Sequence, residues 1–358
     1  MKPNFLDEPH ISVVNEPPKV RISAAAKVVV IIPYYNGAKF IKRSLDSVFS
    51  QTVRPDEVVV VNDGSRDDER DFLHSLVGSY PMKIIDKPNG GQGSARNLGV
   101  AQSTSEFICF LDQDDFYLPR HIEILKRALP RDEPKLGFVY ADLHVGDAEG
   151  NILFMSTVKE HSPQNPKRSL IDLLQNDMFV LPSASIISRE AYEAVGGFDE
   201  QFTGYEDDDL FMRMFRKGYS NHFVDKPVTV WCIHKESTSY SIKMARSRAR
   251  YFTKLYVTYG DDPERGLYFF RDCLSPRFGR MFLQDAFKAA KSNSPARAEI
   301  SEILRIFAGI VYANEHTGRR RKLKLRLAVF LFTRCPPWLV RLSRQALRFR
   351  FIRRRANW

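Results

Sequence analysis

Short apolar runs alternate with helix-patterned stretches through the first third of the chain. Continuous runs rich in β-branched and other apolar side chains are typical of strands buried on both faces of a parallel sheet. Such strands are expected at residues 27–32, 57–61, 82–85 and 107–111. Between the first two, apolar residues from Ile41 to Phe49 recur at helical spacing. This alternation predicts an α/β fold with a doubly wound, mostly parallel sheet flanked by helices, and functional loops at the carboxyl ends of the strands.

A glycine-rich segment, Asn89-Gly90-Gly91-Gln92-Gly93-Ser94, follows the third expected strand. It is neither GxGxxG nor a P-loop with its Lys-Ser/Thr pair, which disfavours a dinucleotide oxidoreductase or an NTPase. A helix is expected from Ala95, with Ser94 as its cap. The segment is either a tight turn before that helix or a place where glycines let a ligand approach the backbone.

The strand expected at 107–111 ends in Asp112-Gln113-Asp114-Asp115, which places three carboxylates within four positions. Adjacent like charges are unfavourable unless a cation or strong donors compensate them. Hard oxygen ligands favour a magnesium- or manganese-like ion, which usually also binds substrate phosphates. The alternative is a solvated acidic turn in which Asp112 or Asp114 caps the next helix.

Beyond Asp115 the hydrophobic pattern is less informative until a second acidic cluster. Strands are expected at 138–142 and 151–155. Four consecutive acids, Glu206 to Asp209, then head a helix whose apolar face begins at Leu210. Acids in a first helical turn are also common partners of the helix dipole, so this cluster alone does not identify a site. Helices are expected again at 247–259 and 296–312.

Composition sets the broad class of the protein. Of its 358 residues, 43% are hydrophobic and 27% charged, as in ordinary globular proteins. The four cysteines have no CxxC spacing, so neither a zinc site nor a disulfide framework is suggested. The N-terminus lacks the apolar core of a signal peptide, and no apolar run approaches the length of a membrane span. We therefore expect a cytoplasmic location.

The positive charge lies at the C-terminus. Residues 319–358 contain fourteen of the 54 Lys/Arg and none of the 43 Asp/Glu, which leaves 40 basic against 43 acidic residues elsewhere. After Pro336-Pro337, apolar residues can line one helix face and arginines the other. A basic amphipathic segment beside Trp338 favours an anionic membrane surface as partner. Nucleic-acid binding is the competing interpretation, although no nucleic-acid module accompanies the arginines; a solvated basic tail is the third.

Several blocks, taken together, resemble glycosyltransferase family 2. They are Ile32-Pro33-Tyr34-Tyr35-Asn36-Gly37, Ser47-Val48-Phe49-Ser50-Gln51-Thr52, Val60-Val61-Asn62-Asp63-Gly64-Ser65, Asn89-Gly90-Gly91 with Ala95-Arg96-Asn97, Leu111-Asp112-Gln113-Asp114-Asp115, and Gly196-Gly197-Phe198-Asp199 followed by Glu206-Asp207. The resemblance covers roughly residues 27–240. It implies a GT-A (Rossmann-like) fold, a nucleotide-sugar donor, a divalent cation (Mn or Mg) and inversion at the anomeric carbon.

The resemblance also implies roles for individual residues. Those expected to bind the donor are Pro33, Tyr35, Asp63, Arg96 and Asp114. Those expected at the metal are Asp115 as the leading ligand, with Asp112 and His234. Two departures from the family pattern stand beside them: Asn62 replaces a frequent aspartate, and Cys232 interrupts the motif that ends at His234. Without these blocks, Asp63 would be read as a turn former, Arg96 as a surface charge and His234 as a structural histidine.

The same resemblance assigns the second acidic cluster to catalysis and acceptor binding. Asp207 falls at the position of the catalytic base, Glu206 at an acceptor-binding position, and Asp209 at one that holds local structure. Inverting transfer needs a base that removes the proton of the acceptor hydroxyl. A retaining mechanism through a covalent intermediate would need a placed nucleophile, which the sequence does not identify.

The resemblance thus implies a metal-dependent inverting glycosyltransferase that moves a sugar, with a UDP-sugar as the commonest donor, to a glycan or lipid-linked saccharide. We expect a role in cell-surface polysaccharide biosynthesis, peripherally on the cytoplasmic membrane face. The expected organisation is a polar N-terminal arm (1–26), a GT-A domain (27–240), a helical extension (241–318) and a basic amphipathic tail (319–358). The alternative is a non-catalytic sugar-nucleotide-binding or assembly protein, which the joint presence of Asp63, Asp115 and Asp207 disfavours. A processive synthase is disfavoured because the Gln-x-x-Arg-Trp motif is absent.

Overall fold

The computed structural model describes residues 26–162, 164–234 and 242–346. Apart from Ala26, the expected N-terminal arm lies outside this range, as do residues 347–358 of the expected tail. The described residues form two compact units. The first comprises the chain up to residue 168 together with 178–201 and 206–234, and the second comprises 169–177, 202–205 and the chain from 242 onward.

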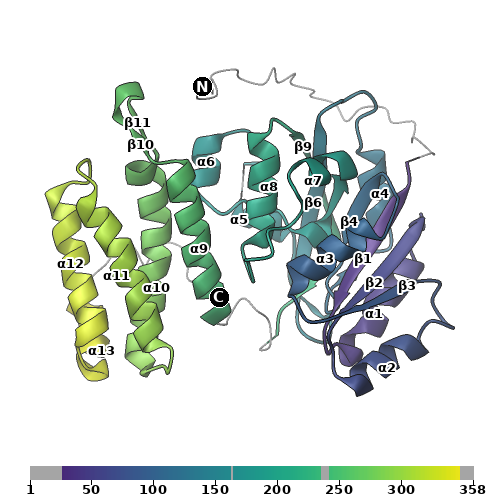
Figure 1. The fold of residues 1–358 in the computed structure, drawn as a ribbon, viewed down its shortest axis with the longest axis horizontal. Helices are drawn as coiled ribbons and strands as arrows, with labels where there is room; N and C mark the ends of the chain where they lie inside the picture. The colour runs from purple at the N-terminus through teal and green to yellow at the C-terminus, as the bar shows by residue number, and fades with distance from the viewer. Residues whose placement is uncertain (1–25, 163, 235–241, 347–358) are drawn as a thin grey trace. The chain divides into compact units, whose positions relative to one another are not determined.

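The first unit is built on a nine-stranded sheet, in which four parallel strands form one half (Figure 1). Their order is β3-β2-β1-β4. They are β1 (Val28–Tyr34), β2 (Glu57–Asp63), β3 (Lys83–Lys87) and β4 (Phe107–Phe110). All four predicted strands are therefore present. The accompanying helices are α1 (Ala38–Phe49), α2 (Asp67–Ser75) and α3 (Gln92–Ala101).

The other half of the sheet continues in the order β4-β8-β6-β9-β5, with β7 paired to β6. Its strands are β5 (Phe116–Tyr117), β6 (Leu136–Gly146), β7 (Ile152–Phe154), β8 (Ser185–Ser188) and β9 (Ser220–Cys232). Six of the nine strands run in one direction, as a mostly parallel sheet requires, whereas β5, β7 and β8 run against their neighbours. The remaining helices of this unit are α4 (His121–Arg127), α5 (Thr157–His161), η1 (Pro182–Ala184), α7 (Arg189–Ala194) and α8 (Glu206–Arg216).

Helix α3 packs closely on β1 and begins earlier than the sequence predicted. All of β1 is buried, and a Cβ added at Gly99 would lie 2.5 Å from the Ile31 side chain, so α3 sits closer to the strand than any larger residue would allow. The helix begins at Gln92, with Gly91 as the N-cap residue at φ +88°. The predicted start at Ala95 with a Ser94 cap is wrong. Gly91 adopts a positive φ that other residues rarely reach, and the helix starts there, about one turn earlier than predicted.

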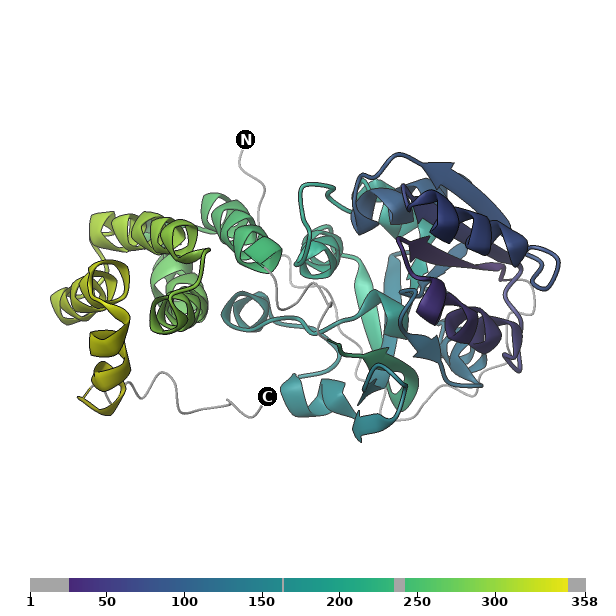
Figure 2. The same cartoon turned by 90° about the horizontal axis from the view of Figure 1, so that it is seen from below.

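The second unit is mainly helical. Its elements are α6 (Leu170–Gln175), α9 (Ile242–Thr258), β10 (Asp261–Asp262), η3 (Pro263–Arg265), β11 (Leu267–Tyr268), the π-helical turn η4 (Phe270–Leu274), α10 (Ser275–Ser292), α11 (Arg297–Ala313), α12 (Arg319–Arg334) and α13 (Pro337–Ala346). The helices predicted at 247–259 and 296–312 are confirmed as α9 and α11. Figure 2 views several of the green-to-yellow helices nearly end-on. Rings of Phe252, Phe278, Phe282 and Phe307 form their shared core. Across the described ranges, none of the helices has both the length and the apolar character needed to span a bilayer.

Candidate donor and acceptor site

Asp63 fixes the glycine-rich segment to the end of β2. Its Oδ1 accepts hydrogen bonds from the Gly90 N–H at 2.8 Å and the Lys87 Nζ at 2.6 Å, and its Oδ2 accepts from the Gly91 N–H at 2.8 Å. The Asn89 side chain also donates to the Asp63 backbone carbonyl. The carboxylate is buried. Asp63 therefore positions the backbone just before α3, and sequence reasoning gave no signal for its partner Lys87.

The loop after β1 presents Tyr35 to solvent. Pro33 is buried within β1, whereas the Tyr35 side chain is half exposed. The Gln113 side chain holds the Tyr35 backbone from both sides, accepting from its N–H at 2.8 Å and donating to its carbonyl at 3.1 Å. A Cβ added at Gly37 would lie 2.2 Å from Gln113 Oε1, so this contact requires glycine there. The acidic segment after β4 and the loop after β1 are thus one connected structure.

Arg96 joins the two acidic clusters. Its side chain on α3 is 3% exposed, and the guanidinium nitrogens lie 2.5 Å from an Asp112 carboxylate oxygen and 3.4 Å from a Glu206 carboxylate oxygen. The Gln92 side chain also donates to Glu206. Burial alone would lower the pKa of the guanidinium, but the neighbouring Asp112 and Glu206 carboxylates raise it above its ordinary value. The arginine is therefore held as a cation between the end of β4 and the start of α8.

The aspartates after β4 occupy different environments. Asp115 is 1% exposed, its Oδ1 accepts from the Cys232 backbone N–H at 2.8 Å, and its Oδ2 has no hydrogen-bond partner among the described residues. Asp114 is only partly buried and pairs with His234 Nε2 at 2.7 Å. Burial, and then the charges of neighbouring aspartates, raise the pKa of both carboxyls. Because Cys232 acts here through its backbone, its departure from the family pattern leaves this contact intact.

The second cluster begins α8, as predicted, and its acids separate by environment. Asp207 is half-buried, and burial together with Glu206 and Asp208 raises its pKa well above the ordinary value. Asp208 is buried and accepts from the Met178 N–H at 3.0 Å, a role that the sequence did not reveal. Asp209 pairs with Arg213 at 2.8 Å, and that arginine also donates to backbone carbonyls of the preceding loop.

The side chains present fit a metal ion that is shared with a bound ligand better than a metal ion enclosed wholly by protein ligands. In the portion of the chain that the structure describes, no group of three or more His, Cys, Asp or Glu side chains is arranged to hold a metal ion. Magnesium, however, usually needs one or two carboxylates, with substrate phosphates and waters completing its shell. The paired and partly exposed side chains of Asp114 and His234 match that requirement.

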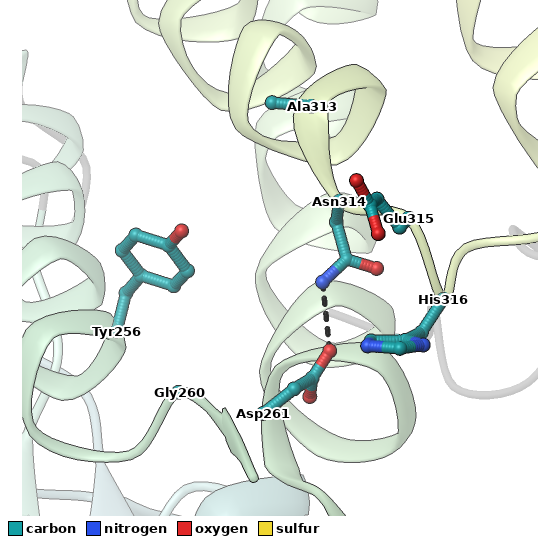
Figure 3. A pocket seen from close by; sticks show the side chains of 7 residues that line it. All are labelled: Tyr256, Gly260, Asp261, Ala313, Asn314, Glu315 and His316. Carbon is teal, nitrogen blue, oxygen red and sulfur yellow. Dashed lines mark hydrogen bonds between the residues drawn. The ribbon is translucent and has the colours of Figure 1, made fainter. Parts of the chain in front are cut away.

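The second unit contains a separate hollow of about 510 Å³, shown in Figure 3. It contains none of the predicted site residues. Its lining includes Tyr256, Asp261 and the connection between α11 and α12 at Ala313–His316.

Known proteins resemble this chain in sequence. Residues 29–196 match the family described as Glycosyl transferase family 2, and residues 182–236 match one described as N-terminal domain of galactosyltransferase. An uncharacterized glycosyltransferase of Rickettsia prowazekii is 32% identical over 192 residues, covering 53% of this chain and 58% of that protein. The hyaluronan synthase of Pasteurella multocida is 28% identical over 219 residues, which cover 61% of this chain and 22% of the synthase. The aligned part therefore spans less than two thirds of these relatives.

Solved structures share the fold. TarS residues 1–349 of S. aureus in complex with UDP-GlcNAc superpose with a TM-score of 0.58 at 17% identity, covering 90% of this chain and 93% of that one. The mannosyltransferase PcManGT of Pyrobaculum calidifontis, in complex with GDP-Man and Mn2+, gives a TM-score of 0.52 at 18% identity and covers 89% and 90% of the two chains. At such identities the likeness establishes a GT-A-like α/β fold with C-terminal helices.

Proposed function

We propose that this chain, a member of glycosyl transferase family 2 through residues 29–196, is a metal-dependent inverting enzyme that uses a nucleotide-sugar donor. The contact of Arg96 with both Asp112 and Glu206 carries the proposal. It brings the segment expected to bind the donor and the segment expected to bind the acceptor to one buried cation, although they are far apart in sequence. A non-catalytic binding protein would not need the second cluster beside the first.

The donor side consists of Tyr35, Asp63 and Arg96. The half-exposed Tyr35 ring offers a face for stacking on a nucleobase. The Gly90 N–H and Lys87 Nζ both donate to Asp63 Oδ1, and the Gly91 N–H donates to Oδ2. One lone pair on Oδ2 is then left to accept from a base N–H. The solved neighbours hold UDP, UDP-GlcNAc and GDP-Man. We take a UDP-sugar as the first candidate, and this choice rests on the resemblance.

We propose that Asp114 and His234 face the cation and that Asp115 supports them from behind. Asp115 was the expected leading ligand, but its depth leaves Asp114 better placed to share an ion with a diphosphate. When bound, such an ion neutralises the charge that develops on the leaving diphosphate. Asp112 contributes to the same region by holding Arg96.

Asp207 would serve as the base. As the acceptor oxygen attacks the anomeric carbon from the face opposite the diphosphate, the new C–O bond forms and the bond to the diphosphate breaks. The hydroxyl proton passes to Asp207, and the configuration inverts. The raised pKa of Asp207 makes its carboxylate a stronger proton acceptor than an ordinary aspartate. Glu206, held by Arg96 and Gln92, keeps the adjacent turn of α8 in place and borders the acceptor.

Support for the class of acceptor is less specific than support for the donor. Two relatives from Pasteurella multocida are named hyaluronan synthase and chondroitin synthase, and the aligned region covers 22% and 21% of them. We propose a glycan or lipid-linked saccharide acceptor in cell-surface polysaccharide biosynthesis, with the enzyme peripheral on the cytoplasmic face of a membrane. The alternative is a non-catalytic sugar-nucleotide-binding or assembly protein.

A donor screen tests the proposal. The protein would be incubated with a panel of nucleotide sugars, with manganese, with magnesium or with EDTA, while thermal stability and release of nucleoside diphosphate are followed. We expect one donor to stabilise the fold and to be hydrolysed slowly, in both cases only with a divalent cation. Binding without hydrolysis or transfer to any saccharide would favour the non-catalytic alternative. A folded protein that binds no donor would contradict the proposal.

A further inference from the structure

Helix α12 is apolar on two opposite faces. Leu325, Ala328 and Phe332 are buried within the helical unit. On the other side, Leu323 and Leu327 are each 59% exposed and Phe330 is 56% exposed. These three follow one another at i, i+4 and i+7, so they form a single stripe along the helix. A helix that merely covers a core carries polar residues at such positions.

The stripe is held in a fixed orientation by contacts on the inner side. Arg321 donates to the Arg271 carbonyl at 3.1 Å, and Lys322 Nζ donates to the Tyr312 carbonyl at 2.9 Å. The connection from α11 to α12 is held in turn by the hydrogen bond from the Asn314 side chain to Asp261 (Figure 3). The outward face of α12 is thus determined by packing.

Basic side chains flank the exposed stripe. Arg319, Arg320, Lys324 and Arg334 are exposed on the same helix. The next helix, α13, adds Trp338 and Leu342, which are 61% and 62% exposed and lie one turn apart. Residues 319–358 contain no acidic residue. Helix α12 therefore presents large apolar side chains together with positive charge. We call this surface the α12 face, and it consists of Leu323, Leu327, Phe330 and the basic residues flanking them.

We propose that the α12 face docks on an anionic lipid bilayer, with Leu323, Leu327 and Phe330 inserted between the headgroups and the flanking arginines and lysines on lipid phosphates. This combination of a basic rim and an apolar stripe matches the interface of a bilayer that carries negative charge. Nucleic-acid phosphates would use the arginines but leave the stripe exposed. A second copy of the chain would bring like-charged rims together across a two-fold axis. This inference names the surface that would hold the enzyme at the membrane. It rests on the proposed function only in assuming that the acceptor lies at the same membrane surface as the enzyme.

Flotation of the full-length protein with vesicles tests the face. We would compare pure phosphatidylcholine vesicles with vesicles containing phosphatidylserine, at low and high salt, for the wild type and for the triple variant Leu323→Ser/Leu327→Ser/Phe330→Ser. Wild type should float with the anionic vesicles and less at high salt. The triple variant should bind them at least about tenfold more weakly, since it lacks the side chains that enter the interface.

The matched control replaces exposed apolar residues elsewhere in the same unit, Val257→Ser/Ile306→Ser, which are also more than half exposed. This control should float like the wild type. Equal flotation of wild type and triple variant, or no flotation at all, would overturn the proposal. So would a dimer in sedimentation that the triple variant abolishes, or tighter binding to an RNA or DNA oligomer than to anionic vesicles. Diphosphate release without vesicles should be unchanged in the triple variant, which separates failure of this face from failure of the proposed chemistry.

Discussion

Replacing Arg96 with methionine removes the cation between two carboxylates while keeping most of the side chain's apolar length. Arg96 and Glu206 are both nearly inaccessible, with side chains 3% and 5% exposed, whereas the Asp112 side chain is 35% exposed. Loss of one partner of a buried pair costs about 3–5 kcal/mol because the other charge stays buried without compensation. Asp112 can regain water, so its share is at most about 1 kcal/mol. Gln92 still donates to Glu206, which places the expected loss near the lower limit, about 3 kcal/mol.

Urea unfolding followed by circular dichroism measures this loss as a lower midpoint at unchanged slope. Arg66→Met is the matched control, because Arg66 is 66% exposed and pairs with the exposed Asp68 and with Glu69, which keeps the Tyr34 hydroxyl and the Ala38 N–H as donors. It should cost less than about 1 kcal/mol. Adding Glu206→Gln to Arg96→Met should recover part of the stability, because the uncompensated charge is then absent. If Arg96→Met and Arg66→Met unfolded at the same urea midpoint, the buried Arg96–Glu206 ion pair would not contribute the free energy of unfolding assigned to it.

Three further outcomes follow from the site. Asp207→Asn should lower kcat by about 10²–10⁴-fold and leave donor affinity in calorimetry unchanged; normal turnover would exclude Asp207 as the base. Since the Asp207 pKa is raised, by burial first and then by Glu206 and Asp208, activity should fall as pH drops through that raised value, where the base becomes protonated. Glu206→Gln should move this acid limb of kcat/KM to lower pH, and an unmoved limb would contradict the coupling. Asp114→Asn and His234→Gln should each raise the manganese concentration for half-maximal activity at least about tenfold; unchanged metal titrations would refute their role.

The sequence was most informative where local pattern and fold coincide. Continuous apolar runs predicted the four parallel strands, because strands buried on both faces carry no polar alternation. The acidic start of α8 was likewise visible. The sequence could not show that β8 lies between β4 and β6, since a run of four residues carries no information about its neighbours. It also placed the start of α3 at the wrong residue, because the positive φ of Gly91 and the Asp63 contacts that precede the helix are tertiary features.

Site residues were found by type and spacing, but their environments were not. Nothing in Asp112-Gln113-Asp114-Asp115 tells which carboxylate is buried, and the structure separates Asp114, beside His234, from Asp115, beneath the end of β9. The pairing of Arg96 with Glu206 joins residues 110 positions apart. Such contacts depend on how strands order themselves in a sheet, which local patterns do not encode.

The place of β8 sets the order in which a growing polypeptide can complete this site. Strand β4 pairs with β1 on one side and with β8 on the other. When a ribosome has delivered residues up to β6, four parallel strands can pair, but the far edge of β4 stays open until Ser185–Ser188 emerge. Glu206 and then β9 arrive later still, and with them the second partner of Arg96 and the backbone N–H that donates to Asp115. Arg96 can already pair with Asp112 at that stage, but Asp114 and Asp115 are synthesised early and meet His234 and the Cys232 N–H late. A nascent chain halted before residue 206 therefore exposes both an unpaired strand edge and two aspartates without these partners.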